Sequence, residues 1–519
     1  MKISSKCIDA LPPLSWVAEV DITSNIATVT HGRWVETHDG FFVEGIWDGA
    51  FIQGGFDMTP NFFGSGAVLR AEGIVFVPSC ATTDYLYYQD SAGRVTVSNS
   101  LPALLAHLGD HLDPSNNDYW RDCESITEGI DAYQPTIKTK LGSVQRLLYR
   151  NLAVERGGTR ILDKPLPPAF TGYETYVGFL RERYGHIAAN SRDAGRRFPL
   201  KILSTQSKGY DSTAVNAIAA PFGIDTAFTV SKSKGSGAFA ENDTALQDDD
   251  DGREISKVLG FECVAIDRRR FQDGLDEEYL YFAGIANCED LNFSGITPHI
   301  DSPSVLITGT LGELYYPGWY YAQRFPGSTA GADLRRGDLG GHGMTEVRLQ
   351  TGFVHLPLIF MGAQHRQAIT RITESREMNP WRLNTTTYDR PIARRIAEEA
   401  GVPRLAFGQK KMATAVSFSR PNIPYHAGLR SEFFAFLDKS GVLPRWQAAM
   451  FPLVHRVNSL IWFTTPKRHR WLYYISRIHA KVTGKPLPLM WTRIESSLYC
   501  FSVNKRIADY ARGRASEQG

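Results

Sequence analysis

The hydrophobic pattern of the chain changes near residue 173, and the two sides of this change require different folds. Before it, short runs of aromatic and β-branched residues, such as 41–47 and 73–77, are separated by turn residues. Beyond it, strand-like apolar runs alternate with helical patterns, the runs being 199–203, 226–230, 263–266 and 304–308. Short strands in series predict an antiparallel sandwich or layered sheet. Strands that alternate with helices predict a parallel sheet covered by helices on both faces.

We therefore expect an α/β protein in two parts. Residues 1–165 form the strand-rich part, and residues 166–519 hold the parallel sheet, become mostly helical beyond Arg376 and include a basic helical tail from about residue 412. A length of 519 residues is enough for two large domains. Hydrophobic residues make up 43% and charged residues 22% of the chain, which excludes a largely disordered or collagen-like protein.

The charge of the chain is nearly balanced but unevenly distributed. The formal net charge is +2, which argues against a nucleic-acid partner for the whole protein, yet residues 466–519 hold eleven Lys and Arg against three Asp and Glu. Aromatic residues stand just before these basic ones (Trp462) and among them (Trp471, Tyr473, Tyr474 and Trp491). Such a tail could lie on an anionic membrane surface or hold an acidic partner. The interpretation that we favour is a helical subdomain with the aromatic residues in its core.

The cysteines and the N-terminus favour a soluble, cytoplasmic protein. Six cysteines lie far apart with no C-x-x-C pair, as expected of reduced thiols. The first residues lack the apolar segment of a signal peptide, and no apolar run approaches the roughly 18 residues that a membrane span needs. The histidines show no zinc-site spacing.

The segment from Ser204 to Ser212 is the first candidate site. It follows the first strand of the α/β part, where ligands bind in open parallel sheets. Small and hydroxyl residues around a glycine let backbone N–H groups converge on an anion at the start of a helix. Asp211 within such a loop suggests phosphates bridged by magnesium. Alternatively, Asp211 or Ser212 caps the helix, and the loop alone does not decide between these two interpretations.

Two other polar segments have plain explanations beside functional ones. The four consecutive aspartates at 248–251 are expected to form a solvated loop that caps the next helix, with magnesium recruitment as the alternative. His342 stands in the glycine-rich segment 330–345, which is either a lid over a substrate or an ordinary surface loop.

Three segments resemble the asparagine synthetase family, whose synthetase domain belongs to the N-type ATP pyrophosphatases with a PP-loop. Residues 207–212 (S-K-G-Y-D-S) resemble the family's S-G-G-x-D-S pyrophosphate loop, with Lys208 in place of the first glycine. Residues 308–318 resemble its S-G-E-G-A-D-E-L-F-G-G segment, with Glu313 at the magnesium-binding Asp and Leu314 at the following Glu. Residues 389–411 resemble its late helix and lysine segment, where either Lys410 or Lys411 holds the position of the lysine that reaches the phosphates.

The resemblance implies an ATP-dependent, AMP-forming carbon–nitrogen ligase with ATP and Mg²⁺ as cofactors. It places magnesium on Asp211 and Glu313 and makes Lys410 or Lys411 catalytic. It assigns the nucleotide and its pyrophosphate to one set of residues, namely Leu203, Ser207, Lys208, Gly209, Tyr210, Asp211, Ser212, Val230 and Gly309. The substrates would be a small-molecule or peptide carboxylate and an amine. The alternative is a non-catalytic, ATP-binding or scaffold descendant of the same fold.

The first part of the chain resembles the family's glutamine-amidotransferase-like domain of the Ntn type. In glutamine-dependent members the nucleophile is a cysteine at position 2, where this chain has Lys2, and Cys7 is the nearest cysteine. We therefore expect a scaffold without glutamine hydrolysis, as in relatives that form β-lactams or lasso peptides. The nitrogen would then come from ammonia or from an amine on a substrate.

Overall fold

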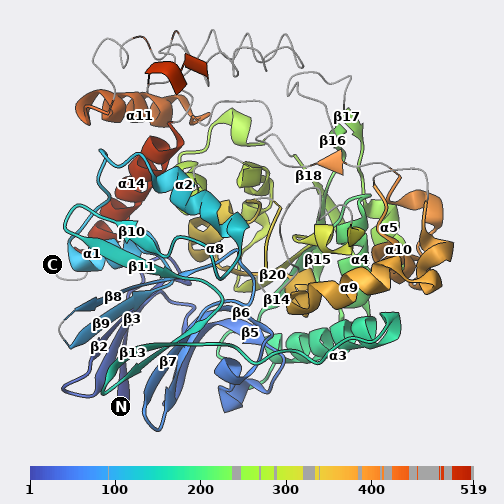
Figure 1. Ribbon diagram of the computed structural model, residues 1–519, viewed down its shortest axis with the longest axis horizontal. Helices are drawn as coiled ribbons and strands as arrows, with labels where there is room; N and C mark the ends of the chain where they lie inside the picture. Colours follow the sequence, from blue (N-terminus) through green and yellow to red (C-terminus); the bar gives the residue numbers. More distant parts are fainter. Residues whose placement is uncertain are drawn as a thin grey trace.

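The computed structural model shows a mixed α/β protein whose sheets confirm the two patterns in the sequence (Figure 1). It describes residues 1–91, 93–235, 247–267, 270–285, 289–318, 334–337, 339–383, 388–409, 412–413, 423–442 and 494–515, with short pieces at 450, 453, 478–479 and 481–483. Within these residues no helix is long and apolar enough to cross a membrane.

Two sheets in the first part pack face to face. One has the order β1-β3-β2-β9-β8-β11-β10 and the other β13-β12-β7-β6-β5-β4, with all pairs antiparallel except β1 and β3. Trp16 of the first sheet contacts Phe42 and Phe76 of the second, with ring centroids 5.0 and 6.0 Å away. The strands are β1 (Lys2–Cys7), β2 (Trp16–Asp21), β3 (Ile26–His31), β4 (Glu36–Thr37), β5 (Phe41–Trp47), β6 (Phe62–Arg70), β7 (Gly73–Val77), β8 (Leu86–Ser91), β9 (Arg94–Ser98), β10 (Thr136–Lys138), β11 (Ser143–Leu147), β12 (Asn151–Glu155) and β13 (Gly158–Leu162).

The second part is built on a parallel sheet with the order β18-β15-β14-β19-β20. The chain starts at the central β14, adds β15 and β18 on one side, and returns to add β19 and β20 on the other. Successive residues of β14 face opposite ways, so that Ile202 and Leu203 belong to different apolar clusters and both faces of the sheet are covered. These strands are β14 (Lys201–Thr205), β15 (Thr226–Val230), β18 (Cys263–Ile266), β19 (Ser304–Thr308) and β20 (Phe353–Pro357).

Helices surround this sheet and continue into the C-terminal region. α4 packs against α3 and α10, while α14 runs beside α1, α2 and α6 (Figure 1). A small antiparallel sheet joins β16 (Lys232–Gly235), β17 (Gln247–Asp249) and β21 (Met412–Ala413). The helices are α1 (Leu101–Leu108), α2 (Tyr119–Glu124), α3 (Tyr173–Ser191), α4 (Tyr210–Ala219), α5 (Arg253–Leu259), α6 (Tyr279–Gly284), α8 (Thr345–Thr351), α9 (Arg366–Glu374), α10 (Pro391–Glu399), α11 (Ala427–Lys439) and α14 (Glu495–Ala515).

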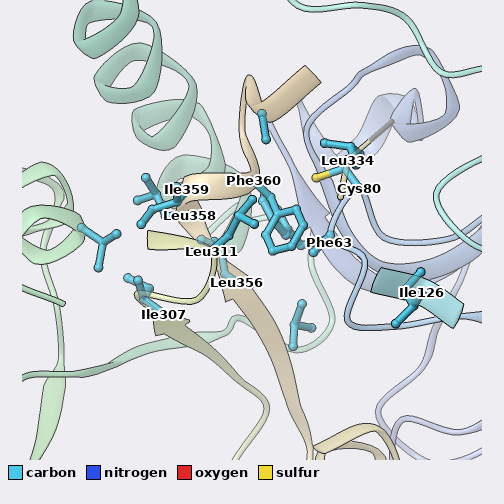
Figure 2. Packing of buried hydrophobic residues seen from close by; sticks show 14 of the residues in the cluster. Phe63, Cys80, Ile126, Ile307, Leu311, Leu334, Leu356, Leu358, Ile359 and Phe360 are labelled. Atoms are coloured by element: carbon cyan, nitrogen blue, oxygen red, sulfur yellow. The ribbon is translucent and has the colours of Figure 1, made fainter. Parts of the chain in front are cut away.

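The two parts share one apolar core and a set of buried ion pairs. Figure 2 shows Phe63 and Cys80 of the first part close to Leu334 and Phe360 of the second. Arg348 of α8 donates to Glu44 of β5 (Nη1 to Oε2, 2.9 Å) and to Asp84 (Nε to Oδ1, 2.7 Å). All three side chains are buried. Because charges removed from water need partners, these bonds fix α8 against the first part.

Removing the arginine tests this interface. We expect Arg348→Met to lower the free energy of unfolding by about 3–5 kcal/mol, because it leaves the buried carboxylates of Glu44 and Asp84 without their cation. The exposed Arg371 on α9 offers a matched control, and Arg371→Met should change stability by less than about 0.5 kcal/mol. Urea denaturation measures both, and equal losses would contradict the assignment.

Candidate functional site

The candidate site lies where the order of the parallel sheet reverses. β14 and β19 are neighbours, but the chain leaves them toward opposite sides of the sheet. From the carboxyl end of β14 the chain runs through residues 206–209 into α4, and from β19 it runs through residues 309–311 into the short 3-10 helix Gly312–Tyr315. In open α/β sheets, ligands bind in the crevice at this position.

The loops after β14 and β19 touch at Asp211. A Cβ atom added to Gly312 would lie 2.0 Å from the Asp211 Cγ, and one added to Gly309 would lie 2.7 Å from the Asp211 Cβ. A side chain at Gly309 would overlap the backbone of Asp211, and one at Gly312 would displace the Asp211 carboxylate; Leu311, between them, has a left-handed backbone (φ 72°). Two of the three segments singled out in the sequence are therefore in contact. Glu313 stands in the second of them, where its Oε1 accepts from the Gly337 N–H (3.3 Å).

The backbone N–H groups of the loop already have acceptors within the chain. Ser207 N donates to Ser212 Oγ (3.1 Å) and Gly209 N to Ser207 Oγ (3.1 Å). Lys208 N donates to the Asp250 carboxylate (2.9 Å), and Tyr210 N to the Tyr388 hydroxyl (3.4 Å). The helix cap is Gly209, so neither Asp211 nor Ser212 is the N-cap residue. Most of these acceptors are hydroxyl groups, which a phosphate oxygen could replace.

Asp250 differs from the solvated loop that the sequence predicts. It is 1% exposed, and its second carboxylate oxygen accepts from Ser233 Oγ (2.7 Å). Burial raises the pKa of Asp250. Its neighbour Asp249 is exposed, and a bond from Lys208 Nζ lowers the pKa of that carboxyl. Four identical residues in a row gave no signal that one of them would be buried against the loop.

The carboxylate of Asp211 is paired with Arg390, a residue to which sequence reasoning gave no role. Arg390 Nη1 donates to Asp211 Oδ1. The guanidinium lies over the Tyr316 ring, 4.3 Å from its centroid, and the arginine is buried. The sequence held one indication of where this arginine lies. Arg390 stands immediately before Pro391, and a proline at the first position of a helix marks where α10 begins.

The residues fit the two implied cofactors unequally. Loop N–H groups, hydroxyls and a buried guanidinium are suitable donors for the phosphates of a nucleotide. Magnesium is disfavoured at Asp211 in this arrangement, because the carboxylate already pairs with the buried Arg390 guanidinium, whose positive charge would repel a second cation at the same group. Among the described residues, no group of three His, Cys, Asp or Glu side chains is placed to hold a metal ion.

The third segment of the resemblance also meets the loop. Gly408 N donates to the Lys208 carbonyl (2.8 Å), and a Cβ on Gly408 would lie 2.4 Å from the Tyr210 ring. Lys410 and Lys411, which follow it, lie outside the described residues. Leu203, in the middle of β14, and Val230, the last residue of β15, are both buried; the resemblance assigned both to the nucleotide. Gly408 therefore contacts the loop, while the positions and roles of the two lysines stay predictions.

A series of buried hydrogen-bonding side chains connects β20 to the loop after β19. His355 of β20 pairs through Nε2 with Thr308 Oγ1 (2.8 Å), which in turn pairs with Thr310 Oγ1 (3.0 Å). Burial lowers the pKa of His355 to about 4. His342 is also buried, between the Tyr85 hydroxyl (3.0 Å) and Arg336 Nη1 (2.8 Å). His342 therefore does not stand in an exposed surface loop, while the lid that was the other expectation for segment 330–345 stays a prediction.

The cysteines and the tail complete the predicted features. Cys7 is exposed at the end of the edge strand β1, which begins at Lys2. Burial raises the pKa of the Cys80 thiol to about 12 and that of Cys123 to about 11, which keeps both protonated. Trp462, Trp471, Tyr473, Tyr474 and Trp491 lie outside the described residues, so the partner of the tail stays a prediction.

Gly312 tests the contact between the two loops. We expect Gly312→Ala to destabilise the protein by about 1–3 kcal/mol, because the new methyl group overlaps the Asp211 carboxylate. Gly178 is an exposed glycine within α3, and an added methyl group would meet nothing within 4 Å. Gly178→Ala should therefore stabilise by about 0.5–1 kcal/mol. Thermal denaturation of both variants checks the prediction, and an unchanged Gly312→Ala protein would contradict it.

His355 should make stability depend on pH. Its folded pKa of about 4 lies below the unfolded value, so the unfolded chain takes up a proton that the folded chain does not, and stability falls as the pH drops from 6.5 toward 4. We expect His355→Gln to remove about 2.5 kcal/mol of the stability lost between about pH 7 and pH 4.5. Denaturant unfolding at both pH values, with His186→Gln on the exposed face of α3 as the control, measures this difference. Equal pH dependence in wild type and His355→Gln would contradict it.

Comparison with known proteins gives no family for the chain. No family model matches the sequence, and no curated protein matches it either. The likeness of the three segments to the asparagine synthetase family therefore stays a prediction, carried by the residues and contacts described above.

Proposed function

We propose that the protein is an ATP-dependent ligase that forms amide bonds by way of an acyl-adenylate. The observation that carries this proposal is the meeting of three segments far apart in the sequence. Asp211 contacts the loop at Gly309 and Gly312, and Lys208 contacts Gly408, all at the carboxyl end of the parallel sheet. These are the segments that resemble the family's nucleotide site, and they meet where open α/β sheets bind their ligands.

The proposed reaction has two steps. A substrate carboxylate oxygen attacks the α-phosphorus of ATP, the bond between the α- and β-phosphates breaks, and pyrophosphate leaves. An amine or ammonia then attacks the acyl carbon, loses a proton, and AMP leaves with the electrons of the acyl–oxygen bond. Activation is needed because a carboxylate is a poor electrophile, and water must be excluded because it would hydrolyse the adenylate.

The chain's own residues would position and neutralise the reacting groups. The N–H groups of residues 207–210 and the start of α4 would hold the phosphates. Lys410 or Lys411 would balance the negative charge that develops during the reaction. Magnesium takes no part in the proposed steps, because the Asp211 carboxylate is paired with Arg390. The carboxylate substrate is a small molecule or a peptide, and the proposal includes no glutamine hydrolysis.

A second candidate function is favoured by the internal bonds of the loop. Each N–H group from Ser207 to Tyr210 donates to a side chain of the protein, and Asp211 is paired with Arg390. A nucleotide would have to displace some of these partners. This arrangement suits a non-catalytic descendant that keeps the fold as an ATP-binding or scaffold protein.

Pyrophosphate release separates the two functions. We expect the purified chain to convert ATP to AMP and pyrophosphate when supplied with carboxylates and amines from cell extract. Lys410→Ala or Lys411→Ala, whichever removes the catalytic lysine, should lower kcat by about 100-fold or more with little change in the KM for ATP, because the lost charge acts in the transition state. Lys439→Ala, at the exposed end of α11, is the control. ATP binding without pyrophosphate release from any of these substrates would favour the non-catalytic function.

A further inference from the structure

Arg390 is a buried cation whose hydrogen-bonding capacity is mostly unused. It is 2% exposed, and a guanidinium offers five N–H donors. Among the described residues, the one side chain that accepts from it is Asp211, and its buried Nε has no hydrogen-bond partner. Buried donors are nearly always satisfied in folded proteins, so an unsatisfied one calls for a ligand or an ordered water.

The guanidinium is held in a fixed position. It lies over the Tyr316 ring at 4.3 Å and near the Tyr388 ring at 5.6 Å. Arg390 is followed by Pro391, which begins α10, so its backbone is anchored to a helix. Because the guanidinium is already held in position, little conformational entropy is lost when it binds an anion.

Arg390 lies beside the donors of the phosphate-type loop. The hydroxyl of Tyr388, two residues before it, accepts from Tyr210 N at 3.4 Å and lies 3.7 Å from where a Cβ of Gly209 would stand. Asp211, the partner of Arg390, belongs to the first turn of α4. The guanidinium and the N-terminal end of α4 therefore lie next to each other, and the positive charge of each favours the binding of an anion.

Two other cations near the loop, among the residues that the structure describes, are paired with protein groups. Lys208 is paired through Nζ with Asp249, and Arg394 donates to the Tyr210 hydroxyl and lies 3.5 Å from Glu398. Negative groups are close as well, because Asp250 accepts from Lys208 N. A phosphate at this loop needs a cation to offset them, and a guanidinium fits phosphate oxygens with two parallel bonds.

We propose that Arg390 is the phosphate-binding cation of this site, and that Asp211 holds its guanidinium in place instead of coordinating a metal ion. The ligand class is a di- or triphosphate chain, either free pyrophosphate or the chain of a nucleotide. The inference rests on the nucleotide site of the proposed function but not on the ligase chemistry.

Titration calorimetry with inorganic pyrophosphate tests this assignment in the full-length protein. We expect the dissociation constant in EDTA to lie within about threefold of that in magnesium, because the protein supplies its own cation. Arg390→Gln should weaken binding by about 30-fold or more, and Arg390→Lys by about fivefold to tenfold, since lysine keeps the charge but not the paired bonds. Asp211→Asn should bind pyrophosphate equally well or more tightly, because the amide oxygen of Asn can still accept from the guanidinium while the competing negative charge is removed.

A matched control is available on the same helix. Arg395 stacks on Tyr173 and pairs with Glu174, Glu377 and Glu399, away from the loop. Arg395→Gln should leave the dissociation constant unchanged. If Arg390→Gln fails to fold by circular dichroism, Arg390→Lys and Asp211→Asn carry the test without it.

Three results would overturn the inference. The first is pyrophosphate binding that needs magnesium and is lost in Asp211→Asn, which is the result expected of a metal ion on Asp211. The second is unchanged binding in Arg390→Gln. The third is the absence of pyrophosphate binding by the wild type. The outcome is separate from that of the ligase proposal. Arg390-dependent pyrophosphate binding in a protein that releases no AMP would support the inference while the ligase fails, and ligase activity with unchanged binding in Arg390→Gln would do the reverse.

Discussion

The close approach of Asp211 to Gly309 and Gly312 is the constraint on which the site depends. It holds the start of α4 against the loop after β19, and a side chain at Gly309 would overlap the Asp211 backbone while one at Gly312 would displace its carboxylate. This contact exists because β14 and β19 are neighbours in the sheet although about 100 residues lie between them, as their register shows in the pairing of Leu203 with Leu306. The geometry of the crevice is thus set by the strand order.

Buried charges organise the rest of the molecule around this crevice. Arg348 joins α8 to the first part of the chain through Glu44 and Asp84, and Glu346 of the same helix accepts from Ser100 and Arg506. These bonds connect α8 to both the N-terminal sheets and α14. Since breaking a buried pair leaves an uncompensated charge, the two parts are held in one arrangement. The same rule applies at Arg390, where the pairing also leaves donors unused.

The sequence predicted the elements of the sheet well, because their apolar runs are long and fully buried. The strands expected at 226–230, 263–266 and 304–308 match β15, β18 and β19, and the change of pattern at residue 173 coincides with the start of α3. The first parallel strand is displaced by two residues, to Lys201–Thr205, and α4 begins at Tyr210, within the segment 204–212 that the sequence predicts as a loop. Polar residues in the first turn of α4 concealed its start from the apolar pattern.

The site was predictable in its segments but not in its pairings. The convergence of the loops follows from strand order, whereas the burial of Asp250 and His342 and the pairing of Asp211 with Arg390 depend on contacts across more than 40 residues. A run of aspartates or an isolated arginine has the same local sequence whether it is solvated or buried. Only the packing of β16 and β17 and of α10 against the loop decides this.

The most direct measurement is the position of a non-hydrolysable ATP analogue in a crystal structure of the complex. The account predicts its phosphates at the N–H groups of residues 207–210 and beside Arg390, with phosphate oxygens replacing the hydroxyl acceptors of Gly209 N and Tyr210 N. An analogue bound elsewhere on the protein, with these internal bonds intact, would contradict it.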